Sequence, residues 1–465
     1  MNALALLILF ILSDNSIKYR FSYKYHNKNK QKIVNKKNLK ILVFLLIFYL
    51  NYLYLFVIKN DMKTQNSQTS QTKSEPSDDY PAEGMKIAMP IKNKLNNFIN
   101  ENFIGTSCEE WNDWKWQIKN SITRTEKLNK VLGKKENDTI INVPENHLPF
   151  RITPYFAHLL ETLPSDHPLY RTIIPTVHEL EIIKEETEDP LDEQKSSPVP
   201  NIVHRYPDRV LFLVTGFCSA YCRYCTRSHM TSKRTDINVS LKEWEAGFQY
   251  IENNKDIRDV IISGGDPLTL RDDQIEYILK RLRSIEHVEM IRIGTKVPVV
   301  LPMRITPELT DILKKYHPLY MSIHFTHPDE LSEDTQKACN MLADAGIPLG
   351  SQSVLLKGVN DDIDTFRRLY KGLLKVRVKP YYIYSCDKIP GSRHFQSTID
   401  KGLEIIDGLR GHMSGYACPQ FVVDTSKGKI SLLPNFIKSI EETKEKKIYT
   451  FRNYNHEEYH YVELV

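Results

Sequence analysis

Residues 218–227 read CSAYCRYCTR and closely follow an apolar run, Val210 to Val214. The spacing C-x3-C-x2-C allows Cys218, Cys222 and Cys225 to bind three irons of a four-iron, four-sulfur (4Fe-4S) cluster. Such clusters are usually held by four thiolates, so a loop with three leaves one iron open to a substrate or cofactor, as at an open catalytic metal position. The stretch therefore predicts a catalytic iron–sulfur cluster.

A zinc knuckle and a set of unrelated buried thiols are the alternatives. Zinc would require a fourth Cys or His at regular spacing. Tyr224 is not such a ligand, although His229 lies close behind the loop. The spacing favours the iron–sulfur cluster.

Composition bounds the class of protein. The 465 residues are 26% charged and 41% hydrophobic, which suits one large domain with attachments or two domains. The net charge of +5 is modest, and much of the excess lies in residues 14–40, so we expect no nucleic-acid partner. Seven cysteines dominated by one tight triplet do not indicate a disulfide framework and favour a reducing compartment.

The N-terminal residues 1–61 are apolar and basic. Ile41 to Ile58 is an 18-residue apolar run, near the lower limit for a membrane-spanning helix. The basic residues before it would place the rest of the chain outside the cytoplasm, which conflicts with a cluster that needs a cytosolic reductant. We interpret residues 1–61 either as a membrane anchor or as an over-long gene model, with translation starting at Met62 or Met85.

The rest of the chain divides by pattern. Residues 62–91, rich in Ser, Thr, Gln and acids, predict a disordered linker. Residues 92–201 predict a helical region, in which the tryptophans of residues 111–116 pack between helices. Residues 202–435 predict the catalytic domain, and residues 436–465 a C-terminal arm.

Within the catalytic domain, apolar or β-branched runs alternate with amphipathic segments. The predicted strands are residues 210–214, 259–262, 290–293, 319–323, 350–355 and 380–384. The predicted helices are residues 241–253, 274–285, 307–316, 332–345 and 363–376. This alternation predicts an α/β fold, a partial (β/α)6 barrel with a parallel sheet. Chemistry in such barrels lies at the carboxyl ends of the strands.

These features resemble the lysine 2,3-aminomutase family of the radical S-adenosylmethionine (SAM) superfamily. The resemblance rests on the cysteine loop, on HRYPDR at residues 204–209, on SGGD at residues 263–266, and on a lysine shortly before Pro434 and Asn435. It covers about residues 109–465 and implies an open six-unit barrel. It also implies three cofactors, the 4Fe-4S cluster, SAM and pyridoxal 5′-phosphate (PLP).

The activity that the resemblance implies is an isomerisation, the interconversion of L-lysine and L-β-lysine. The reduced cluster would cleave SAM to a 5′-deoxyadenosyl radical, which takes a hydrogen from lysine bound to PLP. The nitrogen then moves from C2 to C3. In such an enzyme the cofactors carry the hard chemistry and the protein positions them.

By resemblance, the residues that bind SAM lie at the ends of predicted strands. They are Ser263, Gly264, Gly265, Asp266, His324 and Gln352. A glycine pair after a buried strand lets backbone amides approach a ligand closely, and in the family this Gly-Gly-acid element holds the amino group of SAM. A lone histidine at a strand end is more often structural, so that interpretation of His324 stays open.

The resemblance assigns the covalent attachment of PLP to Lys429. Nothing intrinsic separates this lysine from Lys427, because the family's glycine-rich approach is shortened here to Gly428. Lys427 therefore remains an alternative.

The PLP phosphate would be held near the start of the catalytic domain. Arg205 and Arg209 offer two guanidinium groups that suit phosphate oxygens, with Tyr206 between them; an ordinary charged strand is the alternative. Tyr384 and Tyr381 would pack near the PLP ring or simply fill the barrel.

Three charges are expected to select the substrate. Arg227 can pair with an α-carboxylate through two hydrogen bonds. By resemblance, Asp387 and Asp424 select lysine by capturing its distant ammonium, although each could instead be a turn or cap residue.

The resemblance implies a homo-oligomer and a cytosolic one-electron donor of the flavodoxin or ferredoxin type. The resemblance implies a zinc ion between subunits, bound by a cluster of C-terminal cysteines and by a cysteine after the fifth strand. Here Asp362 stands at a matching position, and no cysteine follows Cys418, so we expect no structural zinc and interpret His456 and His460 as part of a polar tail. We expect a cytoplasmic protein, with membrane contact only if residues 41–58 are expressed.

Two other functions remain open. A mutase of the same design could act on a protein-bound lysine or on another amino acid. A non-catalytic iron–sulfur or zinc protein tethered to the membrane would show neither PLP absorbance nor SAM cleavage.

Overall fold

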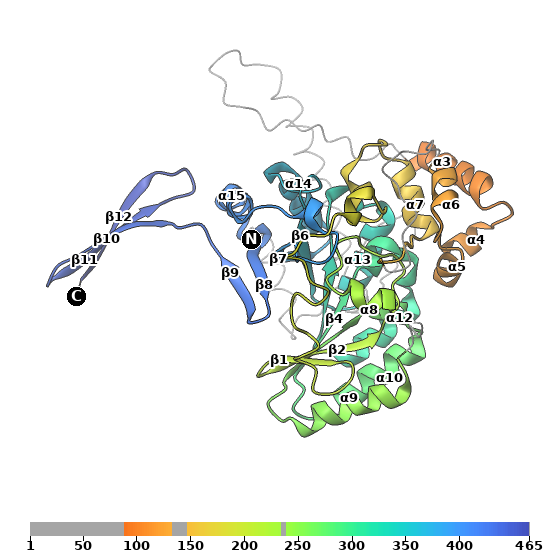
Figure 1. Ribbon diagram of the computed structural model, residues 1–465, viewed down its shortest axis with the longest axis horizontal. Coiled ribbons are helices and arrows are strands. Elements are labelled where there is room, and N and C mark those ends of the chain that lie inside the picture. Colours follow the sequence, from red (N-terminus) through yellow and green to blue (C-terminus); the bar gives the residue numbers. More distant parts are fainter. Residues whose placement is uncertain (1–87, 133–146, 234–238, 465) are drawn as a thin grey trace, which may run out of the picture. The chain divides into compact units, whose positions relative to one another are not determined.

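The computed structural model describes residues 88–132, 147–233 and 239–464, drawn in colour in Figure 1. Residues 87–465 form one compact unit. The apolar run at residues 41–58 and most of the predicted linker lie outside the described residues. Among the residues described, no helix is both long and apolar enough to cross a membrane.

A nine-stranded sheet forms the centre of this unit, with its strands in sequence order (Figure 1). The strands are β1 (Ile202–Tyr206), β2 (Arg209–Thr215), β3 (Asp259–Gly264), β4 (Met290–Thr295), β5 (Leu319–His324), β6 (Leu349–Leu355), β7 (Val378–Ser385), β8 (Gln420–Thr425) and β9 (Gly428–Leu432). Strands β2 to β8 pair in parallel, whereas β1 and β9 are antiparallel to their neighbours. The six predicted strands are confirmed as β2 to β7, and β1, β8 and β9 extend the sheet.

The five predicted helices are also confirmed, and a further helix follows β7. They are α9 (Leu241–Asn253), α10 (Asp272–Arg283), α12 (Pro307–Leu313), α13 (Glu333–Asp344) and α14 (Ile363–Lys375), followed by the unpredicted α15 (Ile399–Leu409). Each connects parallel strands and buries an apolar stripe. Asp362, which stands where the family has a zinc ligand, caps α14 by accepting a hydrogen bond from the Thr365 amide at 2.8 Å.

The described residues before Leu180 are mostly helical. Its elements are α3 (Ala88–Asn102), α4 (Cys108–Asn112), α5 (Trp114–Lys119), α6 (Thr125–Val131), α7 (Pro154–Glu161), η2 (Pro168–Thr172) and η3 (Val177–Leu180). Trp111 is buried against Phe98, Phe103 and Trp116, which confirms that this aromatic packs between helices. Residues 181–201 then run to the sheet without a helix or strand.

The C-terminal residues form a three-stranded antiparallel sheet. Its strands are β10 (Ile437–Glu442), β11 (Lys446–Arg452) and β12 (Glu458–Leu464). Because His456 lies in the turn before β12 and His460 on the strand, the two share no helix face. His460 instead lies 3.1 Å from the hydroxyl of Thr450.

Short elements complete the described chain. They are α8 (Ser228–Lys233), α11 (Val297–Val300), η4 (Pro267–Thr269), η5 (Pro302–Arg304), η6 (Lys314–Tyr316), η7 (Pro328–Glu330), η8 (Arg393–Phe395) and η9 (Gly415–Ala417).

Side chains link the two outer strands of the large sheet. The hydroxyl of Tyr206 on β1 accepts a hydrogen bond from the backbone amide of Lys429 on β9, at 2.9 Å. Arg205, also on β1, donates to the carbonyl of Thr425 at the end of β8, at 3.0 Å. These bonds bring β1 beside the β8–β9 hairpin, so the curved sheet encloses an interior.

Candidate active site

One cavity of about 590 Å³ follows the inner face of the sheet and reaches the loops at the carboxyl ends of the strands. Every residue that the sequence assigned to the cluster, SAM, PLP or substrate lines this cavity. These residues are Cys218, Cys222, Cys225, Ser263, Gly264, Gly265, Asp266, His324, Gln352, Lys429, Arg205, Tyr206, Arg209, Tyr384, Arg227, Asp387 and Asp424. The barrel therefore brings together groups that are spread over more than two hundred residues of sequence.

The cysteine loop lies directly after β2 and is pinned from outside the cavity. Arg223, between the second and third cysteines, is buried and pairs with Glu179 of η3 at 2.5 Å. Burial, and next the neighbouring Cys222, raise the pKa of the Cys225 thiol to about 11. Free thiols are thus disfavoured as thiolates here, and a bound metal centre would supply the positive charge that holds them deprotonated.

Tyr224 and His324 form a buried pair beside the cluster loop. The Tyr224 hydroxyl lies 2.7 Å from the Thr326 hydroxyl and 3.0 Å from His324 Nε2, and the two rings stack. Burial lowers the pKa of His324 to about 3, so the imidazole is neutral. His324 therefore has a structural partner as well as a place on the cavity wall.

The glycine pair at the end of β3 packs closely against the backbone that follows β2. The amides of Gly265 and Asp266 donate to the carbonyls of Thr215 and Phe217, at 2.6 and 2.7 Å, and are not directed at a ligand. A Cβ atom on Gly264 would lie 2.2 Å from the Thr215 oxygen, and Gly264 has φ +126°. Glycine is required here because the strand packs directly on the backbone that leads into the cysteine loop.

The Asp266 carboxylate bonds mainly to backbone amides of the loop after β4. Its carboxylate accepts hydrogen bonds from the Thr295 hydroxyl and the Lys296 amide, both at 2.7 Å, and from the Val297 amide at 3.1 Å. Burial raises the pKa of Asp266 to about 6, although these hydrogen bonds oppose the shift. The group therefore organises the cavity wall between β3 and β4.

Lys429 is distinguished from Lys427 by the tertiary structure. Lys429 lines the cavity, with its Nζ atom 5.6 Å from the centre of the Tyr384 ring, whereas Lys427 does not line it. Gly428, between them, has φ +113°, which reverses the chain between β8 and β9.

The two arginines assigned to phosphate differ in how far they are engaged. Arg205 bonds to Asp424, to the Thr425 carbonyl and to the Leu191 carbonyl, which leaves its buried Nε without a partner. Arg209 stacks on the Tyr206 ring at 4.1 Å and pairs with the exposed Asp208. Arg209 is thus the freer of the two guanidinium groups.

The three charged residues that we expect to select the substrate all have hydrogen-bond partners within the protein. Arg227 forms two hydrogen bonds with Glu193, each at 2.7 Å, and Asp387 accepts one from the Thr226 hydroxyl at 2.5 Å. Burial raises the pKa of Asp387 to about 6, and the nearby Asp424 acts in the same direction. We did not predict Glu193, because it lies in an irregular proline-flanked segment whose pattern does not indicate a contact with Arg227.

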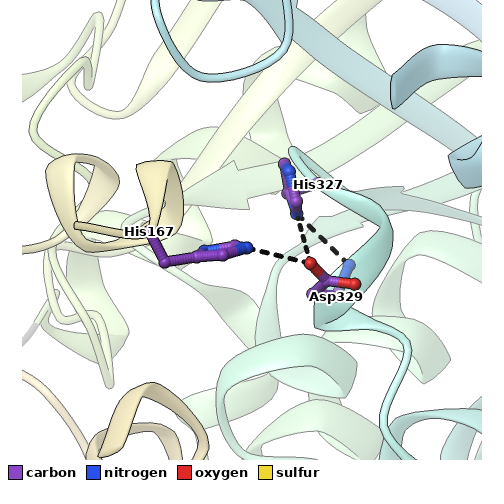
Figure 2. Close-up of side chains that lie close together, drawn as sticks. All are labelled: His167, His327 and Asp329. Atoms are coloured by element: carbon purple, nitrogen blue, oxygen red, sulfur yellow. Dashed lines mark hydrogen bonds and ion pairs between the residues drawn. The ribbon is translucent and has the colours of Figure 1, made fainter. Parts of the chain in front are cut away.

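A second group of potential metal ligands lies outside the cavity (Figure 2). His167 Nε2 and His327 Nδ1 lie 2.9 and 3.4 Å from the same oxygen of Asp329. His167 Nδ1, however, accepts a hydrogen bond from the Leu169 amide, at 3.2 Å. A neutral imidazole that bound a metal through Nε2 would carry its proton on Nδ1, facing that amide. We therefore interpret the group as a hydrogen-bonded link between η2 and η7.

The three cysteines of the loop after β2 line the cavity together. Three thiols on one cavity wall suit a metal cluster, and one lysine with two arginines suits a phosphorylated aldehyde such as PLP.

This sheet, closed around a cavity with three cysteines on the loop after its first parallel strand, defines a radical SAM enzyme. The family model described as Radical SAM superfamily matches residues 212–369, and the model described as Lysine-2,3-aminomutase matches residues 406–463. The chain belongs to the lysine 2,3-aminomutase family.

The regions similar to curated relatives make up most of this chain and most of each relative. The L-lysine 2,3-aminomutase of Acetoanaerobium sticklandii is 48% identical, over 74% of this chain and 83% of the relative. That of Clostridium subterminale is 47% identical, over 72% of this chain and 82% of the relative. A glutamate 2,3-aminomutase from Clostridioides difficile is 42% identical, over 75% and 82% of the two chains.

Proposed function

We propose that this protein interconverts L-lysine and L-β-lysine, as an isomerase that uses a 4Fe-4S cluster, SAM and PLP. The observation that carries the proposal is that one cavity is lined by three thiols, by Lys429 and by three charged side chains. The charged residues are Arg227, which suits a carboxylate, and Asp387 and Asp424, which suit an ammonium group. When bound, the cluster and SAM supply a carbon radical, and PLP supplies the ring that stabilises the migrating nitrogen.

The residues are proposed to divide this work. Cys218, Cys222 and Cys225 hold the cluster. The SAM molecule is held by residues at and just after the end of β3 and on β5 and β6, namely Ser263, Gly264, Gly265, Asp266, His324 and Gln352. PLP is held by Lys429, by Arg205, Tyr206 and Arg209 at its phosphate, and by Tyr384 at its ring.

Three charged side chains of the cavity wall are proposed to bind the substrate. Arg227 binds the α-carboxylate, and Asp387 with Asp424 binds the ε-ammonium. The two carboxylates would repel the side-chain carboxylate of glutamate. The local charge therefore favours lysine over glutamate, and an enclosed interior limits the access of water to a radical.

The test is a reconstitution without oxygen. Protein loaded with iron, sulfide and PLP is given SAM, dithionite and either L-lysine, L-glutamate or a lysine-containing protein, and the β-amino product is measured. We expect β-lysine from free lysine alone, and no product from a Cys218→Ala variant. Product from glutamate only, or from protein-bound lysine only, would refute the assignment.

Several finer features are proposed with this function. The electron donor is a cytosolic flavodoxin or ferredoxin, the enzyme is a homo-oligomer, and its compartment is the cytoplasm. The chain is divided into an N-terminal extension to residue 61, a linker to residue 91, a helical region to residue 201, the barrel to residue 435 and a C-terminal arm.

A further inference from the structure

Arg227 is held by a buried carboxylate that belongs to another segment of the chain. Glu193 accepts hydrogen bonds from Nε and Nη2 of Arg227, both at 2.7 Å. Glu193 is 5% exposed, and the adjacent guanidinium holds the pKa of its carboxyl below the ordinary value in spite of burial. The pair is therefore ionised and, because it is bidentate, has one fixed geometry.

The segment around Glu193 is itself anchored. The Glu193 amide donates to Asp189 Oδ1 at 2.9 Å, and its carbonyl accepts from the Ser197 hydroxyl at 2.8 Å. The carbonyl of Leu191 in the same segment accepts from Arg205 at 2.6 Å. One short segment thus forms hydrogen bonds with two arginines that line the cavity, Arg205 and Arg227.

The pairing leaves part of the guanidinium available. Arginine presents five N–H donors, and Glu193 takes Nε and one hydrogen of Nη2. The opposite edge, formed by Nη1 and the second hydrogen of Nη2, has the spacing of a carboxylate. Arg227 lines the cavity, and Nη1 has no partner among the residues that the structure describes.

We infer that Glu193 is a positioning residue, which orients Arg227 so that its free edge receives the α-carboxylate of the substrate. The inference rests on the proposed function, because it names the ligand of that edge. It differs from two simpler roles. Glu193 could serve only to stabilise the fold, or it could compete with the substrate carboxylate for the same cation.

The experiment compares ligands that keep or lack a carboxylate. Binding of L-norleucine, which has the carboxylate but no ε-amine, and of 1,5-diaminopentane, which has both amines but no carboxylate, is measured by calorimetry. The proteins are the reconstituted wild type, Glu193→Gln and Glu193→Asp, with the exposed Glu185→Gln as the charge control. Thermal unfolding is recorded for each.

We expect Glu193→Gln to weaken norleucine binding by about tenfold, the usual size for a hydrogen bond to a charged group. Diaminopentane binding should stay within about twofold of the wild type on the same scale, and Glu193→Asp should recover part of the loss. The lysine KM should rise more than kcat falls.

Two results would overturn the inference. Equal weakening of both ligands would mean a purely structural role, and tighter norleucine binding would mean competition. If Glu193→Gln does not fold, the Glu193→Asp variant provides the test, because its affinities for norleucine and diaminopentane can be compared in the same way. Absence of β-lysine formation by the wild type would refute the proposed function, while the calorimetric ratio would still report on Glu193.

Discussion

The Nζ atom of Lys429 lies 2.6 Å from Oδ2 of Asp424, so the amine assigned to PLP is paired with a carboxylate assigned to the substrate. The other Asp424 oxygen accepts from Arg205 at 3.2 Å and from the Thr425 amide at 3.1 Å. The side chain of Lys429 and that of the proposed substrate end in the same ammonium group. Asp424 therefore already pairs with an ammonium group of the kind that it is proposed to bind in the substrate.

Lys429→Ala should abolish retention of PLP, whereas Lys427→Ala should retain it. The physical reason is that, of these two lysines, Lys429 lines the cavity and Lys427 does not. The measurement is the visible absorbance of PLP that remains on the protein after desalting, with iron content as the control for folding. Equal retention by both variants would show that neither amine is the attachment point.

Asp424→Asn should weaken lysine more than norleucine. Loss of one member of a buried charge pair removes a charge-assisted hydrogen bond to the ε-ammonium, which we expect to raise the lysine KM by about ten- to a hundredfold. Norleucine lacks that ammonium, so its inhibition constant is the internal control. A uniform change in both constants would contradict the assignment.

Asp387 should give lysine turnover an acid limb near pH 6. Burial raises its pKa to about 6, and only the ionised carboxylate attracts the substrate ammonium. As the pH falls below that pKa, kcat/KM for lysine should therefore fall by about tenfold per pH unit. Since Asp266 titrates in the same range, Asp387→Asn separates the two: it should remove the limb if Asp387 is responsible.

The same shift has a consequence for stability. The folded pKa of Asp387 is raised above its unfolded value, so folding favours the protonated acid. The stability that this group contributes is present below about pH 4 and is lost as the pH rises through about 6. Asp387→Asn should consequently unfold at a higher temperature than the wild type at pH 8, even though its turnover is lower. A lower unfolding temperature would contradict the burial argument.

Gly402→Ala should destabilise the domain, whereas Gly415→Ala should not. A Cβ atom on Gly402 of α15 would lie 2.2 Å from the Phe421 ring of β8, while none of the described residues comes within 4 Å of the same atom on Gly415. Overpacking of this kind costs about 1–3 kcal/mol. Urea unfolding of the two variants measures the difference, and a shift in both or in neither would contradict the packing.

The fold could be predicted largely because its signals are local. A strand such as β4 shows alternating buried and less buried residues, and a helix such as α9 shows a capping residue and an apolar stripe. Both patterns repeat over a few neighbouring residues, so they are visible in the sequence. Strands β9, β10 and β12 were missed because they are largely exposed and lack that contrast between apolar and polar residues. Strand β8, in which Phe421 and Val422 are buried, carries an apolar signal and was overlooked.

The sequence by itself determined the six strands, the five helices, the cysteine spacing and, through resemblance, which side chains should meet. Only the tertiary structure decided that Lys429 rather than Lys427 lines the cavity, that Glu193 holds Arg227, and that the glycines after β3 pack on backbone. The physical reason is distance along the chain. Closure of the curved sheet joins segments whose local patterns carry no information about one another, so their pairings arise only when the barrel forms.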